Sequence, residues 1–111
     1  MIKLRYSDAF KRQVKRLSRR YRRIKNDIQP IFEQLESGEI LGNQIKGVSY
    51  PLYKIRVKNN DAKRGKSGGY RIIYYLVSGE DITLITIYSK SDQSDIETTE
   101  ILDIIQQEDQ G

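Results

Sequence analysis

Hydrophobic and polar residues alternate at the start of the chain and then change to a helical spacing. Residues 2–6 read Ile-Lys-Leu-Arg-Tyr, and this period of two predicts a strand. Ser7 and Asp8 can cap a helix after it, because short polar side chains satisfy the free backbone amides of a first helical turn. Two apolar stripes at spacings of three and four then predict a helical hairpin packed on a sheet. The stripes consist of Phe10, Val14 and Leu17, and of Ile24, Ile28, Ile31 and Leu35.

Proline at position 30 interrupts the second stripe. A proline inside a helix removes one backbone hydrogen bond and clashes with the preceding turn. Either the helix bends at Pro30, or a new helix begins near residues 26–27 and holds Pro30 in its first turn, where proline is tolerated. Gly38 predicts the end of this helix, because glycine readily adopts the backbone conformation that terminates helices.

The second half of the chain has the short period of strands. Residues 39–51 predict a connecting loop, and residues 53–58 alternate strictly between apolar and basic side chains. Residues 70–77 and 82–88 are rich in isoleucine and tyrosine. They predict two strands at the centre of the sheet, joined by a turn at 78–81.

A closing helix is predicted behind these strands. Ser94 and Glu97 have the spacing of a capping box, in which a serine begins the helix and a glutamate three residues later bonds back to it. The apolar face of this helix would consist of Ile101, Leu102, Ile104 and Ile105. The order strand, two helices, three strands and helix predicts an α+β fold. A length of 111 residues predicts one domain that spans residues 1–111.

The composition limits the chemistry that the chain can perform. It has no cysteine and no histidine, which excludes zinc fingers, thiolate nucleophiles and Ser-His-Asp triads. A metal site made of carboxylates alone stays open, but we expect neither a metal nor a small-molecule cofactor, and acid–base chemistry then falls to Lys, Arg, Tyr, Asp or Glu. The chain shows no export signal and no apolar run near the ~18 residues that span a bilayer. With the absence of cysteine, this predicts a cytoplasmic protein without membrane contact.

Charge is distributed very unevenly along the chain. Residues 1–90 hold all 20 Lys and Arg against 8 acids, whereas residues 91–111 hold 7 acids and no base. The basic body predicts a polyanionic partner, and the alternative is a solvated surface that aids solubility. Residues 1–25 alone carry eleven bases against Asp8. This cationic helix could follow phosphates, form a solvated face, or dock an acidic partner.

The third predicted strand carries a row of cations on one face. Three cations in a row, followed by a basic loop, form a positive surface whose self-repulsion an anion such as nucleic acid would relieve. The alternative is an edge strand that lysines protect from aggregation. The row consists of Lys54, Arg56 and Lys58, and the loop adds Lys63, Arg64 and Lys66.

Three further residues on the last two strands are candidates for a site. Arg71 lies in an otherwise apolar strand, and buried arginine is rare unless it is paired or faces a cleft. Tyr88 and Lys90 follow at the end of the last strand, where functional groups are often displayed. The alternatives are an ion pair for Arg71, a core or edge tyrosine, and an ordinary surface lysine.

Three stretches of the chain together resemble RelE/ParE toxins, and they are most similar to the HigB-like RelE branch. They are Leu-Tyr-Lys-Ile-Arg-Val at 52–57, Gly-Gly-Tyr-Arg-Ile-Ile-Tyr-Tyr at 68–75, and Thr-Ile-Tyr-Ser-Lys at 86–90 continuing to Ser94 and Asp95. The resemblance implies an N-terminal strand and helical hairpin packed on a small, mainly antiparallel four-stranded sheet, with a C-terminal helix. It also implies a metal-independent endoribonuclease that cuts messenger RNA in the ribosomal A site and is neutralised by a cognate antitoxin.

The resemblance further implies roles for individual residues. The RNA 2′-hydroxyl would attack the adjacent phosphate, with Lys54 as general base and Arg71 as the group that binds the phosphate. Arg56 and Lys90 match basic positions of the family, and Tyr88 would stack a base or relay a proton. Nucleic acid would also contact Lys58, Lys63, Arg64 and Lys66.

Two other functions stay open at this point. One is a ParE-like inhibitor of DNA gyrase, and the other is a non-catalytic nucleic-acid-binding module with the same fold. The chain has Ser91 and Glu97 where the best-studied RelE pattern has arginine and tyrosine, which leaves room for the second. The acidic C-terminal helix would either close the fold as an ordinary amphipathic helix or compete with RNA near the site.

Overall fold

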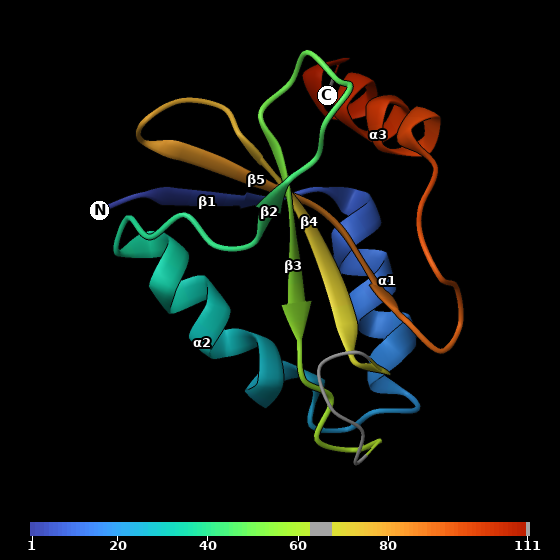
Figure 1. The fold of residues 1–111 in the computed structure, drawn as a ribbon. Coiled ribbons are helices and arrows are strands. Elements are labelled where there is room, and N and C mark those ends of the chain that lie inside the picture. The colour runs from blue at the N-terminus through green and yellow to red at the C-terminus, as the bar shows by residue number, and fades with distance from the viewer. Residues whose placement is uncertain (63–67, 111) are drawn as a thin grey trace.

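The chain forms three helices and five strands in a computed structural model that describes residues 1–62 and 68–110 (Figure 1). In chain order the elements are β1 (Lys3–Tyr6), α1 (Asp8–Ser18), α2 (Ile24–Glu36), β2 (Asn43–Gln44), β3 (Leu52–Val57), β4 (Tyr70–Leu76), β5 (Asp81–Ser89) and α3 (Thr98–Gln110). This order confirms the predicted α+β fold. No helix in the described part of the chain is both long and apolar enough to cross a bilayer.

The strands form one sheet in the order β1-β5-β4-β3-β2. β1 pairs with β5 in parallel, and every other pairing is antiparallel. The sheet has five strands where four were expected, because two residues of the predicted loop, Asn43 and Gln44, pair with β3. Gly42 precedes them with a φ of +81°, and a Cβ there would lie 2.3 Å from the carbonyl oxygen of Lys54. The close approach of β2 therefore requires glycine.

Helices cover both faces of the sheet, so β4 is buried on both sides. Tyr70, Ile72 and Tyr74 belong to a core shared with α1 and α2. Ile73 and Tyr75 point to the other face, where a second core forms with Ile101, Ile104 and Ile105 of α3. In Figure 1 α3 lies apart from α2, whereas it reaches the start of α1, where the Glu108 side chain accepts from the Asp8 amide at 2.9 Å.

Local signals predicted the start of α1 correctly and the start of α3 wrongly. The Ser7 hydroxyl caps α1 by accepting from the Phe10 amide at 2.9 Å. The predicted capping box at Ser94 does not form, because α3 begins only at Thr98. The Asp95 carboxylate instead accepts from Lys54 on β3.

Proline 30 lies in the interior of α2, which decides between the two arrangements that the sequence allowed. The helix begins at Ile24, so Pro30 is beyond its first turn, and the helix continues to Glu36. Its apolar face supplies Ile24, Ile28 and Leu35 to the core. Packing of this face maintains the helix although one backbone hydrogen bond is missing. Gly38 follows the end of the helix with a φ of +100°.

Replacing Ser7 by alanine should lower the free energy of unfolding by about 1–2 kcal/mol. Ser7 is fully buried, and besides capping α1 it donates to the Ile85 carbonyl at 2.5 Å. Urea unfolding would measure the loss. Ser37→Ala is the matched control, because its exposed hydroxyl bonds only the Gln34 carbonyl of its own helix. Equal losses in the two variants would contradict this role of Ser7.

Candidate nucleic-acid interface on the sheet

Two rows of side chains cross the middle of the sheet on the face that also carries α3. Arg56 pairs directly with Arg71, and Arg71 pairs directly with Tyr88, which places the three on one face. In the next row, Lys54 pairs with Ile73. Lys54, Arg56, Arg71 and Tyr88 come from these two neighbouring rows and share one face. We call these four residues together the basic row. The structure therefore brings together four of the five residues that the sequence assigned to catalysis.

Arg71 is the most buried charge of this group, with 4% of its surface exposed. One of its guanidinium nitrogens donates to the Tyr70 carbonyl at 3.2 Å. A buried guanidinium keeps its charge, because arginine does not lose its proton in proteins. The residue therefore supplies a fixed positive charge beneath the surface at which Arg56 is exposed.

Asp95 is a member of this site that was not among the predicted catalytic or nucleic-acid-binding residues. Its Oδ1 atom accepts from Lys54 Nζ at 2.8 Å and from the Ile96 amide at 2.8 Å. The Tyr88 hydroxyl lies 3.4 Å from the same oxygen. The sequence signals for Asp95 were the concentration of acids after residue 90 and its place in the third family-like stretch, and neither indicated its partner.

The pKa values of Asp95 and Tyr88 are shifted in opposite directions. The hydrogen bond from Lys54 is the largest influence that lowers the pKa of Asp95, and the Ile96 amide adds to it. Burial raises the pKa of Tyr88 to about 12, and the charge of Asp95 and the hydrogen bond to it contribute in the same direction. At neutral pH the site therefore holds a carboxylate and a protonated phenol.

Two further predicted residues, Lys90 and Lys58, lie just beyond the ends of β5 and β3. The Lys90 ammonium donates to the Ser94 carbonyl at 2.7 Å, so it stabilises the turn after β5. Lys58 is exposed just beyond the end of β3. The remaining nucleic-acid-binding candidates, Lys63, Arg64 and Lys66, lie outside the described residues.

The segment between β5 and α3 carries the acids that meet the basic body. We call residues 90–97 the acidic strap. Its Asp92 forms an ion pair with Arg20 just beyond α1, and its Asp95 forms the pair with Lys54. In Figure 1 the strap is the orange segment that runs from β5 past α1 and turns back to α3.

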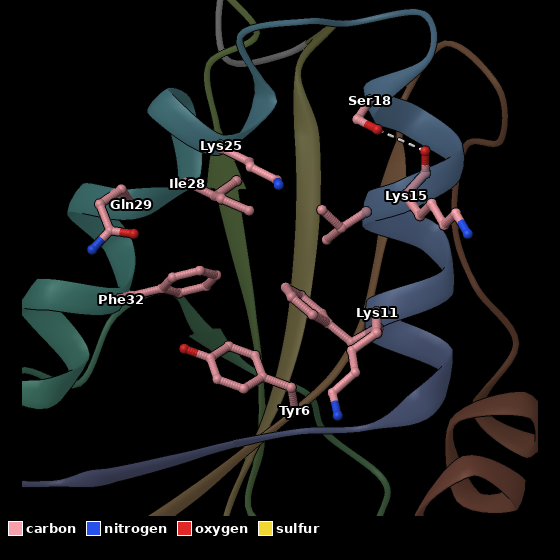
Figure 2. Close-up of a pocket in the computed structure, with 10 residues that line it drawn as sticks. Tyr6, Lys11, Lys15, Ser18, Lys25, Ile28, Gln29 and Phe32 are labelled. Atoms are coloured by element: carbon pink, nitrogen blue, oxygen red, sulfur yellow. Dashed lines mark hydrogen bonds between the residues drawn. The ribbon is translucent and has the colours of Figure 1, made fainter.

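A second surface lies between α1 and α2, on the opposite face of the sheet. It is a groove of about 500 Å³ whose walls are apolar and whose rim is basic. Figure 2 shows Tyr6, Ile28 and Phe32 pointing into it, with Lys25 reaching toward it from α2. The ring centroids of Tyr6 and Phe32 are 5.5 Å apart in an edge-on arrangement. Lys11 and Lys15 on α1 complete the basic rim.

Acidic side chains are not gathered into a metal-binding cluster within residues 1–62 and 68–110. No group of three or more acidic, histidine or cysteine side chains in these two ranges could hold a metal ion. The charged members of the basic row are cations, which attract anions.

Residues 4–94 match the family model described as the ParE toxin of the type II toxin-antitoxin system parDE. The chain belongs to the ParE toxin family. This confirms the resemblance to RelE/ParE toxins, and it identifies the chain as a type II toxin, which implies a cognate antitoxin. The HigB-like assignment stays a prediction. No curated protein gave a significant match.

Replacing Asp95 of the toxin by asparagine should lower the pKa of Tyr88 from about 12. The negative charge that disfavours the phenolate would be gone. The pKa should stay above the ordinary value of 10.0, because burial is the largest cause of the shift. NMR titration of ring-labelled tyrosine would measure it. Asp92→Asn should leave this pKa unchanged, and an unchanged value in Asp95→Asn would contradict the coupling.

Proposed function

We propose that this toxin is a metal-independent endoribonuclease of the HigB-like type that cleaves messenger RNA in the ribosomal A site. The observation that supports the proposal best is the basic row. Lys54, Arg56 and Arg71 share one face of the sheet with Tyr88, and Arg71 is buried beneath that face. A surface that concentrates cations beside a proton donor suits a phosphodiester whose transition state gains negative charge.

The proposed reaction needs groups for one phosphate and two protons. The RNA 2′-oxygen attacks the adjacent phosphorus while the bond to the 5′-oxygen breaks, leaving a 2′,3′-cyclic phosphate and a 5′-hydroxyl. Arg71 stabilises the charge on the phosphoryl oxygens. Lys54, once released from Asp95 and after its own ammonium proton has passed to water, accepts the proton of the 2′-hydroxyl. Tyr88 is protonated at neutral pH because of its raised pKa, so it can donate to the departing 5′-oxygen.

A second candidate function is inhibition of DNA gyrase. The family description favours it, because the matched model is named for the ParE toxin. Under this alternative the basic row would bind a protein–DNA complex and would cut no RNA. The two candidates differ in the polymer that is damaged, so one set of assays separates them.

We also propose where the cognate antitoxin binds. The groove between α1 and α2 has aromatic and aliphatic walls and three lysines at its rim. An amphipathic segment with an apolar face and acidic flanks complements both features. Because the groove and the basic row lie on opposite faces of the sheet, the antitoxin would need a further segment to cover the row.

The first test is RNA 5′-end mapping in a reconstituted translation reaction with wild-type toxin and Arg71→Ala. Wild type should generate new ends within translated codons, and these ends should be absent without ribosomes. Arg71→Ala should reduce cleavage by about a hundredfold or more, because a lost transition-state contact to a developing charge costs about that much. Arg22→Ala is the control, since Arg22 is exposed in the turn between α1 and α2.

The variant must be shown to fold, because Arg71 is buried. Arg71→Lys keeps a positive charge and should retain more cleavage than Arg71→Ala, though less than wild type. If wild-type toxin leaves messenger RNA intact while gyrase accumulates on cleaved DNA, the nuclease proposal is wrong and the gyrase candidate is correct. Binding of nucleic acid without either effect would leave the non-catalytic module.

Charge reversal at the rim of the groove should weaken binding of the antitoxin. The double variant Lys11→Glu/Lys25→Glu should raise the dissociation constant by about tenfold at low salt, because two favourable pairs become repulsive. Isothermal titration calorimetry with the purified antitoxin would measure this. Lys3→Glu on β1 is the control, since it is exposed away from the groove. Equal affinities of the double variant and the control would contradict this docking surface.

A further inference from the structure

Three hydrogen-bond donors converge on a single oxygen atom at the edge of the basic row. Lys54 Nζ and the Ile96 amide each lie 2.8 Å from Asp95 Oδ1, and the Tyr88 hydroxyl lies 3.4 Å away. One donor is an ammonium, one is a phenol and one is a backbone amide. Such a mixture around one point is what binds a phosphate oxygen in nucleic-acid complexes.

We propose that this position is a phosphate subsite for RNA, and that the Asp95 carboxylate fills it in the free toxin. That the ligand is RNA rests on the proposed nuclease function. That the toxin's own carboxylate occupies the subsite rests on the contacts of Asp95. The carboxylate imitates the phosphate in charge and in acceptor geometry. An RNA strand must displace it before its phosphate reaches Lys54 and Tyr88.

The strap is built so that this displacement is local. Asp92 remains attached to Arg20, and the Lys90 ammonium remains attached to the Ser94 carbonyl, because neither contact involves the Asp95 side chain. The Gln93 side chain also holds the Asp95 carbonyl at 2.9 Å, through the backbone. Rotation of the Asp95 side chain alone is therefore enough to open the subsite.

The balance of interactions favours RNA over the carboxylate once RNA is present. The side chains of Asp95 and Lys54 are 66% and 31% exposed, and ion pairs this exposed are weak. An RNA strand carries a series of phosphates, so it would also meet Arg56 and Arg71, the other cations of the basic row, whereas Asp95 offers a single carboxylate. A small anion would gain only the three donors around this position, so the carboxylate would exclude it more effectively than it excludes RNA.

If Asp95 instead held Lys54 in place for catalysis, removing its charge would change RNA binding in the opposite direction. If the carboxylate served to orient the ammonium for chemistry, removing its charge would weaken binding or cleavage. If it occupies the place of a phosphate, removing its charge should strengthen binding. The sign of the change therefore distinguishes the two roles.

Asp92 provides a matched control within the same strap. It is also an aspartate in an ion pair, and its side chain is 43% exposed against 53% for that of its partner Arg20. Asp92→Asn and Asp95→Asn change the net charge of the toxin equally. A difference between them therefore reports the subsite and excludes a general effect of charge.

The test is fluorescence anisotropy with a short 2′-O-methyl RNA oligonucleotide, which cannot undergo attack by its 2′-oxygen. Asp95→Asn should bind about fivefold more tightly than wild type at low salt, because one exposed ion pair no longer has to be broken. Asp92→Asn should remain within about twofold of wild type. Equal affinities of the two variants, or weaker binding by Asp95→Asn, would overturn the proposal.

Cleavage of unmodified messenger RNA, measured in parallel, separates this inference from the proposed function. If Asp95→Asn binds more tightly but neither it nor wild type cuts RNA, the subsite stands and the nuclease function fails. If wild type cuts RNA and Asp95→Asn binds no more tightly, the nuclease function stands and the subsite fails. If no form of the toxin binds the oligonucleotide, both are overturned.

Discussion

The burial of β4 on both faces is the constraint around which the site is organised. One face of the strand supplies Tyr70, Ile72 and Tyr74 to the core beneath α1 and α2. The other supplies Ile73 and Tyr75 to the core beneath α3, and the same alternation places Arg71 on that second face. A charge in this position costs desolvation energy, which neighbouring polar groups or a bound anion must offset. The basic surface of β3 and the protonated Tyr88 border this buried charge on either side.

The acids at the end of the chain pair with the basic body through the acidic strap. Asp92 and Asp95 lie against Arg20 and Lys54, so the acids after residue 90 reach two separate parts of the basic body. The basic row and the groove between α1 and α2 use opposite faces of one sheet. We propose that the row binds RNA and that the groove binds the antitoxin. Under this proposal, an antitoxin bound in the groove alone would leave the basic row uncovered.

Periodicity was sufficient for most of the fold. The alternation in β3 and the apolar runs of β4 and β5 placed Lys54, Arg56, Arg71 and Tyr88 on their strands, because strands impose their spacing locally. The cross-strand register that brings them together could not be predicted from periodicity and came with the structure. The two-residue β2 was missed, since a strand that short has no period and depends on the close approach of Gly42 to Lys54. The contact of Asp95 was missed for a related reason: its partner Lys54 is 41 residues away, and no local pattern records that contact.

A crystal structure of the toxin with a 2′-O-methyl RNA oligonucleotide would decide whether the basic row is an RNA site. We expect a phosphate bound between Arg71 and Lys54, with the Asp95 side chain turned away and the Asp92–Arg20 pair intact. RNA bound elsewhere on the toxin, with the Asp95 carboxylate still on Lys54, would contradict an RNA site at the basic row.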